Sequence, residues 1–387
     1  MSAADDASGT HGPLYGVRVI ELAGKGPSQF GAMVLADLGA DVIRVDRPTE
    51  VDRPMGFYDP RLDLLNRGRR SIALDLSSPD GVDTVLALVT TADAVVVPFR
   101  PGVADRLGIG SSDCLRVNPD VVYAGVTGWG ADGPDAQRAG HDINFLAANG
   151  VLDMIGRADG PPVPPLNLVG DFGGGGMLLA VAILAGIHAS RGGSGGQVVD
   201  VSMLEASSLL TTVVHSLKAM GDWGPRGTNL LDTGAPYYDV YRTRDDKYMS
   251  VGAMERKFYL ELLSALDLGD DPMMVAAHHD RSLWAAAKDR LTEAFAVSTR
   301  DEWEQVFRGR DACVEAIRTV DEAASHPQVK ARNLYPSIFG VSQPAPVPRY
   351  SVTPLTVKRP PPKTGEHADE ILAELAEFDR RTAYDAR

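Results

Sequence analysis

The first half of the chain alternates between short apolar runs and longer stretches of helical character. The apolar runs predict buried β-strands at residues 17–22, 41–45, 94–97, 121–126 and 197–201. Between and after them, helices are predicted at residues 32–38, 79–90 and 177–189. Apolar strands that alternate with helices are typical of a parallel sheet covered on both faces, so the pattern predicts an α/β fold.

The pattern changes after residue 211. Two short strands are predicted at 237–241 and 248–251, followed by helices near 257–266, 283–295 and 300–307, which together indicate a smaller α+β domain. Residues 344–362 are rich in proline and predict an extended strap that leads to a last helix at 369–378. We therefore expect a large domain over 1–215, a small domain over 216–335, and a strap and helix over 336–387 that return to the large domain.

Composition and charge narrow the class of protein. The 387 residues carry a net charge of −14, which argues against a nucleic-acid partner because such proteins present basic surfaces. Cys114 and Cys313 lie far apart and outside any metal-ligand spacing, so we expect two buried, reduced thiols and no metal site. The polar residues 1–12 lack the apolar core of a signal peptide, and the apolar run 177–187 is too short to span a bilayer. These features predict a cytoplasmic protein with no membrane partner.

Two glycine-flanked segments carry the candidate chemistry. Residues 140–145 read GHDINF and contain His141, and residues 167–176 read NLVGDFGGGG and contain Asp171. Asp171 is expected to open a helix, whose first N–H groups and dipole favour a negative charge. A histidine and a carboxylate of different acidity, beside such a helix end, suit chemistry that passes through an enolate.

Taken in order, the motifs resemble the family III CoA-transferase superfamily and, within it, the α-methylacyl-CoA racemases. Besides the two segments above, the resemblance rests on residues 12–14 (GPL), 35–42 (LADLGADV), 66–68 (NRG), 99–102 (FRPG), 127–130 (TGWG), 234–239 (GAPYYD), 252–255 (GAME) and 365–367 (GEH). It implies a Rossmann-like large domain built from both chain ends with a smaller domain between them. It also implies an interlocked homodimer, with each active site at the interface of two chains.

The same resemblance implies an acid–base pair. His141 and Asp171 would flank the α-carbon of a 2-methylacyl-CoA thioester and interconvert its 2R and 2S forms by 1,1-proton transfer. The enolate oxygen is expected at the backbone N–H of Asp171, and the glycines that follow would let the thioester approach closely. Glu255 from the partner subunit would orient His141, and Asn167 would hydrogen-bond Asp171. No cofactor is expected, since CoA is part of the substrate.

A further set of residues is expected to bind CoA and the acyl substrate. Guanidinium groups suit phosphates, and residues 74–77 are expected to form a strand that holds the adenine. The set comprises Arg47, Leu74, Asp75, Leu76, Ser77, Phe99, Arg100, Arg106, Gly140, Asp142, Ile143, Asn144, Phe145 and Tyr238. The chain departs from the family pattern at Lys25, at Ser77, where lysine is frequent, and at Pro98, where glycine is usual; these changes bear on CoA affinity and acyl preference.

Each role has an alternative. Read without the resemblance, His141 is a loop residue, Asp171 caps a helix, Glu255 caps the helix near 257, and the arginines are solvated. Asp142 and Asn144 are then structural residues that form the loop. At the level of the protein, one alternative is a CoA-transferase in which Asp171 carries the acyl group, and another is a CoA-binding protein without activity. His141, which the transferases usually lack, favours the racemase. Bile-acid-like, pristanoyl-type and arylpropionyl chains are all compatible with an apolar acyl site.

Overall fold

The computed structural model describes residues 11–48 and 59–385, so most of the polar N-terminal segment 1–12 lies outside the described residues. The contacts between residues divide the chain into two compact units. The first contains the described residues up to Asn149, Leu166–Leu210, and the chain from Asn333 onward; the second contains Gly150–Pro165 and Thr211–Arg332. The segment Gly150–Pro165 thus belongs to the second unit, although it lies inside the range 1–215 expected for the large domain.

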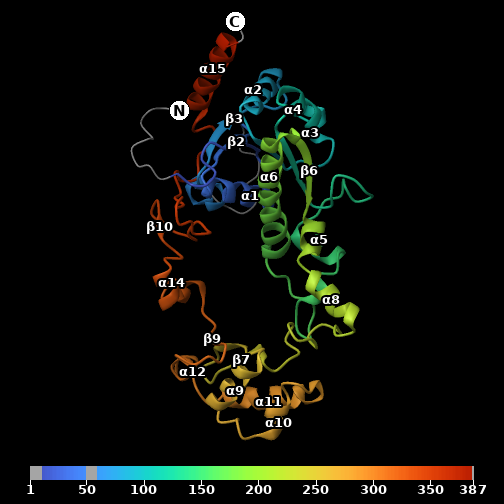
Figure 1. Cartoon of the computed structure of the whole chain (residues 1–387), viewed down its shortest axis with the longest axis vertical. Helices are drawn as coiled ribbons and strands as arrows, with labels where there is room; N and C mark the ends of the chain where they lie inside the picture. Colours follow the sequence, from blue (N-terminus) through green and yellow to red (C-terminus); the bar gives the residue numbers. More distant parts are fainter. Residues whose placement is uncertain (1–10, 49–58, 386–387) are drawn as a thin grey trace. The chain divides into compact units, whose positions relative to one another are not determined.

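A six-stranded parallel sheet forms the centre of the first unit (Figure 1). Its strands are β1 (Arg18–Leu22), β2 (Asp41–Asp46), β3 (Arg70–Ala73), β4 (Ala94–Val97), β5 (Val122–Thr127) and β6 (Gln197–Ser202). They lie in the order β3-β2-β1-β4-β5-β6, and every neighbouring pair is parallel. This is the doubly wound order, in which the direction of winding reverses between β1 and β4. The predicted α/β class is confirmed.

Strand β3 is the strand that the apolar pattern did not reveal. It begins with Arg70, whose charge interrupts the apolar pattern. The side chain is nevertheless buried, because it forms ion pairs with Asp41 (2.6 Å) and Glu374 (2.7 Å). The strand expected at residues 74–77 is wrong, because those residues form the turn that follows β3. The carboxylate of Asp75 accepts hydrogen bonds from the backbone N–H and the hydroxyl of Ser77, which favours a turn over an extended strand.

Helices cover both faces of this sheet. On one face lie α1 (Pro27–Asp37) and α6 (Met177–Ala189), whose Leu35 and Ile183 share a core with the valines of the central strands. On the other face lie α2 (Pro79–Thr90), α3 (Val103–Leu107), α4 (Ser111–Val117) and α15 (Ala368–Asp385). Cys114 of α4 is buried there as expected, and burial raises the pKa of its thiol to about 12. Cys313 is exposed, which corrects the expectation that both thiols are buried.

Helix α6 is part of a longer helix. A wide π-helical turn η4 (Leu168–Gly176) leads into it and η5 (Ser190–Ser194) continues it, which gives one helix of 27 residues. Its mean hydropathy reaches 1.8, so by length and composition it is long and apolar enough to cross a membrane, unlike the run 177–187 taken alone. Core helices of folded domains pass the same test, and Leu179, Ile183 and Ile187 are buried in the core of the first unit.

The C-terminal strap and helix belong to the first unit. Residues 344–362 contain no helix or strand, as their proline content predicts, and a short hairpin of β10 (Ser337–Ile338) and β11 (Val341–Ser342) precedes them. Helix α15 buries Ile371 and Leu375 in the core, beside the strand that carries Ile72. Glu374 also pairs with Arg18 at 2.9 Å, so apolar and ionic contacts together hold the helix.

The second unit is built on a three-stranded antiparallel sheet. Its strands β7 (Tyr238–Arg242), β8 (Tyr248–Gly252) and β9 (Val314–Ala316) share a core with α9 (Arg256–Ala265), α11 (Trp284–Phe295) and α12 (Arg300–Phe307). Both predicted strands and all three predicted helices are present, and β9 is additional. The other α-helices of the described residues, which belong to both units, are α5 (Asp142–Ala148), α7 (Met203–Leu209), α8 (Thr212–Met220), α10 (Pro272–Ala276), α13 (Val320–Ala323) and α14 (Pro327–Ala331).

The docking of α15 can be tested with two neighbouring side chains. Ile371 is 1% exposed and Leu372 is 45% exposed. Ile371→Ala leaves a cavity in the core and is expected to lower the free energy of unfolding by about 2–5 kcal/mol. Leu372→Ala, the matched control, is expected to change it by less than about 0.5 kcal/mol. Urea unfolding followed by circular dichroism measures both, and equal losses in the two variants would contradict the docking.

Candidate active site

A pocket of about 290 Å³ lies at the carboxyl ends of the central strands of the first unit. Its wall is formed by residues 25–28 after β1, residues 98–100 after β4, and residues 126–129 at the end of β5. Ligands of doubly wound proteins bind at the carboxyl edge of the sheet where the strand order reverses. The pocket therefore occupies the position that the topology favours. The other residues that line it are Ala136, Arg138, Gly140, His141, Phe145, Asp171 and Met203.

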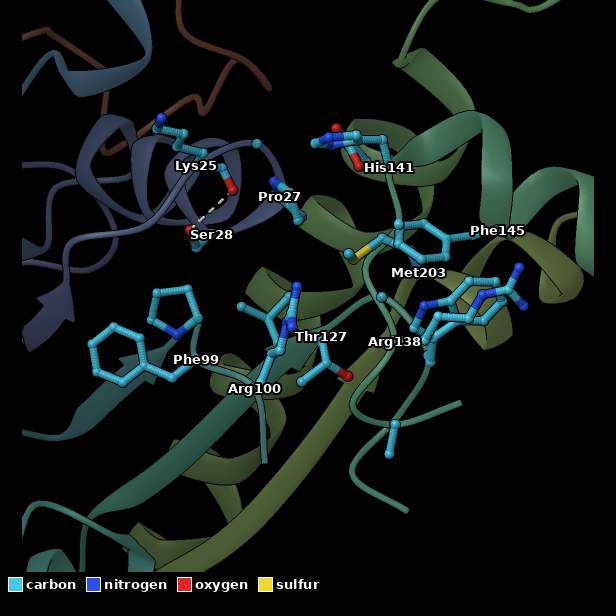
Figure 2. A pocket seen from close by; sticks show the side chains of 18 residues that line it. Lys25, Pro27, Ser28, Phe99, Arg100, Thr127, Arg138, His141, Phe145 and Met203 are labelled. Atoms are coloured by element: carbon cyan, nitrogen blue, oxygen red, sulfur yellow. Dashed lines mark hydrogen bonds between the residues drawn. The ribbon is translucent and has the colours of Figure 1, made fainter. Parts of the chain in front are cut away.

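His141 precedes helix α5 and has an exposed side chain on the pocket. Its backbone N–H donates a hydrogen bond to Oδ1 of Asn144 (3.0 Å), which fixes the turn into the helix. Phe145 packs edge-on against Trp129 beneath this turn, with ring centroids 4.9 Å apart. A Cβ at Gly140 would lie 2.6 Å from the Phe145 ring, so glycine is required there. Figure 2 shows His141 and Phe145 on one side of the pocket and Lys25 and Ser28 on the other.

Asp171 reaches the same pocket from η4. It lies inside this wide turn, which begins at Leu168, and so it is not the residue that caps the helix. Its carboxylate contacts the loop before α1: a Cβ at Gly26, whose φ is +64°, would lie 3.1 Å from Oδ2 of Asp171. A substituent at Gly26 would therefore crowd the acid as well as strain the backbone.

The glycines after Asp171 serve packing more than ligand approach. Gly174, Gly175 and Gly176 are buried. A Cβ at Gly176 would lie 2.8 Å from the ring of Phe30, and one at Gly175 would lie 3.2 Å from Pro27. The glycine run lets α1 lie directly against the turn that carries Asp171. Gly173 is exposed, and the expectation that a glycine there admits the thioester stays a prediction.

The backbone N–H of Asp171 is already engaged. It donates a hydrogen bond of 2.7 Å to Oδ2 of Asp142, so the expected placement of the enolate oxygen on this group is corrected. Asp142 itself is buried, at 5% exposure, and does not line the pocket, which also corrects its expected contact with substrate. The expected hydrogen bond from Asn167 to Oδ2 of Asp171 is present at 3.3 Å.

The environment of Asp171 favours its protonated form. Burial raises the pKa of the Asp171 carboxyl, the hydrogen bond from Asn167 opposes the shift, the charge of Asp142 adds to it, and His141 opposes it. Burial dominates because the carboxylate loses contact with water. A carboxyl group whose pKa is raised toward neutrality is suited to both donate and accept a proton.

One buried carboxylate holds the loop that forms a wall of the pocket. Glu21, at the end of β1, pairs with Arg44 (2.8 Å) and Arg69 (2.9 Å). Arg44 donates a hydrogen bond to the carbonyl of Gly24 in the loop, and Arg69 donates one to the carbonyl of Gln29 in the first turn of α1, so the loop and the start of the helix are both anchored. Burial lowers the pKa of Arg69 to about 10, and the attraction of Glu21 limits the shift, so the guanidinium stays charged at neutral pH. Two arginines around one carboxylate make this wall rigid.

The other predicted residues are spread over the two units. Phe99, Arg100, Gly140 and Phe145 line the pocket with the acid–base pair, and an Arg100 guanidinium N–H donates to the carbonyl of Gln137 at 3.2 Å. The other residues that were predicted to bind CoA or the acyl group from the first unit do not line the pocket. Four of them are exposed, namely Arg47, Arg106, Ile143 and Asn144, and four follow β3, namely Leu74, Asp75, Leu76 and Ser77. Glu255 and Tyr238 belong to the second unit. Glu255 directly precedes α9, and its side chain makes no capping hydrogen bond.

The sequence did not identify most of the other residues that line the pocket, and three of them have large side chains. Trp129 and Arg138 lie in the connection from β5 to α5, with the Arg138 guanidinium 5.3 Å from the centroid of the Trp129 ring. Met203 begins α7 directly after β6. The usable signal was their place after strand ends, since the carboxyl ends of parallel strands share one edge. Among the described residues, no three His, Cys, Asp or Glu side chains cluster in a way that could hold a metal ion.

Residues 14–368 match the model of CoA-transferase family III. The chain is 40% identical to human α-methylacyl-CoA racemase over 377 residues, which cover 96% of this chain and 95% of the relative. It is 28% identical to human succinyl-CoA:glutarate CoA-transferase over 392 residues, which cover 95% of this chain and 87% of that one. Among solved structures, a CAIB/BAIF family protein from Brucella suis superimposes with a TM-score of 0.79 at 26% identity, covering 94% of this chain and all of the other.

The raised pKa of Asp171 has a consequence for stability. A carboxyl that binds its proton more tightly when folded contributes its full stability below the unfolded pKa of about 3.9 and loses that contribution as the pH rises through the folded value. Asp171→Asn removes the buried charge and is therefore expected to raise the melting temperature at pH 7, by an amount that shrinks toward pH 4. Calorimetry between pH 4 and 8 measures this. Asp132→Asn, at an exposed loop position, is the control. A gain that is independent of pH would contradict the expectation.

Proposed function

The chain belongs to CoA-transferase family III, and from that membership we propose that it is an α-methylacyl-CoA racemase, an isomerase that interconverts 2R- and 2S-methylacyl-CoA thioesters. The observation that carries the proposal is that His141 and Asp171, from different elements, line one pocket. The 40% identity to the human racemase, against 28% to the human transferase, supports the same choice.

The proposed reaction uses the two groups on opposite faces of one carbon. One of them takes the α-proton of the thioester, the electron pair moves into the carbonyl to form an enolate, and the other group returns a proton to the opposite face. In the reverse direction the two groups exchange roles. The raised pKa of Asp171 supports this, because the acid must be protonated in one direction and ionised in the other. The positive end of the long helix that begins at Leu168 favours the negative charge of the enolate.

CoA is proposed to bind along the same edge of the sheet. Arg47 follows β2, Arg100 follows β4, and Arg106 lies in α3 just beyond, so three guanidinium groups accompany the carboxyl ends of the strands. Their forked donors suit phosphate oxygens. The turn at residues 74–77 follows β3 at that edge and is proposed to contact the adenine. No cofactor or metal is proposed, since the chemistry needs only an acid, a base and the bound thioester.

Glu255 and Tyr238 are proposed to complete the site from a partner subunit in an interlocked homodimer. The first unit supports an interface, because it exposes large apolar side chains on α6, β6 and the end of α7. These are Met177, Val181, Val198, Leu209 and Leu210, each more than two-fifths exposed. In such a dimer Glu255 would hold the imidazole of His141 in one tautomer.

An exchange assay tests the racemase. A pure 2R-methylacyl-CoA is incubated in deuterated water without any acceptor acid, and we expect racemisation with deuterium incorporated at the α-carbon. His141→Ala and Asp171→Ala are each expected to slow it by about 10²–10⁴-fold while CoA binding, measured by calorimetry, survives. Acyl movement only after a free acid is added would instead support the transferase, in which Asp171 forms an acyl anhydride. Full activity of either variant would remove that residue from the mechanism.

Complementation tests the shared site. His141→Ala and Glu255→Ala chains are each expected to be impaired alone. When the two are co-expressed, a mixed dimer has one site with His141 from one chain and Glu255 from the other. Random pairing then restores about one active site in four if the site is shared. If both residues act within one chain, every site lacks a group and activity stays at the level of the single variants.

A further inference from the structure

Asp142 links the two proposed acid–base residues. It follows His141 in the chain as the first residue of α5, and its Oδ2 accepts the backbone N–H of Asp171 at 2.7 Å. The side chain is 5% exposed. Its second oxygen, Oδ1, is buried and has no hydrogen-bond partner among the described residues. A buried carboxylate with one oxygen unpaired costs stability, so its place beside the acid–base pair calls for an explanation.

The surrounding backbone is shaped to admit this carboxylate. Gly170 directly precedes Asp171 and is buried, and a Cβ there would lie 2.6 Å from Oδ2 of Asp142. Any larger residue at position 170 would separate the two segments. Helix α5 packs against both η4 and α7, so the hydrogen bond joins elements that are already in contact.

We propose that Asp142 is a positioning residue of the racemase, which ties the turn that bears Asp171 to the helix that begins beside His141 and keeps a second negative charge next to the Asp171 carboxyl. The proposal rests on the proposed function, since it assigns a role within the same acid–base pair. Two groups that must reach opposite faces of one carbon have to be held within about 0.5 Å of the productive geometry. The hydrogen bond between the carboxylate of Asp142 and the backbone N–H of Asp171 supplies that restraint.

The charge of Asp142 acts on the proton of Asp171. A neighbouring negative charge disfavours the ionised form, and it adds to the rise in the pKa of Asp171 that burial causes. The other ionisable side chains that line the pocket with Asp171 are His141 on the turn before α5, Lys25 on the loop before α1, Arg100 after β4 and Arg138 on the connection before α5. Glu205 belongs to α7, which packs against η4 and α5, and its carboxylate accepts a hydrogen bond from the hydroxyl of Ser202. Removing the charge of Asp142 therefore lowers the pKa of Asp171.

Asp142→Asn separates charge from tether. The amide oxygen of the new residue still accepts the Asp171 N–H, but the negative charge is gone. The acidic limb of the profile of kcat/KM against pH, which reports deprotonation of the more acidic member of the pair, is expected to move to lower pH. Asp142→Ala also removes the tether and is expected to lower kcat by about 10–100-fold with little change in KM, because misplacement of the acid affects the reaction more than binding. Asp132→Asn, a matched charge removal on the exposed connection before α5, is expected to leave rate and profile unchanged.

A second measurement does not depend on activity. Melting temperatures at pH 7 are compared for the wild type, Asp142→Asn, Asp171→Asn and the double variant. If the two carboxylates repel each other, Asp171→Asn raises the melting temperature less in the Asp142→Asn background than in the wild type. Additive effects together with an unchanged pH profile of Asp142→Asn would overturn the proposal. If the effects of the two substitutions on the melting temperature are not additive but the wild type does not racemise the thioester, the interaction between Asp142 and Asp171 stands and the proposed function is wrong.

Discussion

The reversal of strand order between β1 and β4 is the constraint on which the rest of this structure depends. Because the chain winds outward in both directions from this point, the loops after the two strands diverge and leave an opening at the carboxyl edge of the sheet. The pocket occupies that opening. The long helix that begins at η4 packs against α1, which places Asp171 beside the loop after β1. The site thus follows from the order of the strands and from the close packing that glycines permit.

Buried charges make this opening rigid. Glu21 is fully buried, and its two arginine partners anchor the loop after β1 and the first turn of α1. In the same unit, the carboxylate of Asp142 accepts a hydrogen bond from the backbone N–H of Asp171. Paired and hydrogen-bonded charges are tolerated in a core only where partners are in place, so each of these groups specifies one arrangement of its loop. The wall of the pocket is held by polar contacts, whereas the sheet beneath it is held by apolar packing.

The course of the chain relates both acid–base residues to the second unit. After α5 the chain enters that unit at Gly150, and it returns at Leu166, just before Asn167 and Asp171. Within the second unit this excursion is anchored by Arg157, which pairs with the buried Asp239 at 2.7 Å, and by Asp153, which pairs with Arg226 at 2.8 Å. The segment that carries His141 therefore ends where the chain enters the second unit, and the segment that carries Asp171 begins where the chain returns to the first unit. The same topology brings them together across nearly thirty intervening residues.

The order of residues alone determined the local helices and strands and the candidate acid–base residues. Apolar runs and their spacing depend on neighbours along the chain, and they predicted five of the six parallel strands, the helix α2, and the α/β class; the motifs around His141 and Asp171 indicated the acid–base pair. The tertiary structure decided what depends on partners distant in sequence. Arg70 begins a buried strand because its guanidinium pairs with the carboxylates of Asp41 and Glu374. Residues 74–77 form a turn after that strand, and Cys313 is exposed. The tertiary structure also gave the N–H of Asp171 to Asp142, because only the packing of α5 against η4 determines which acceptor reaches that group.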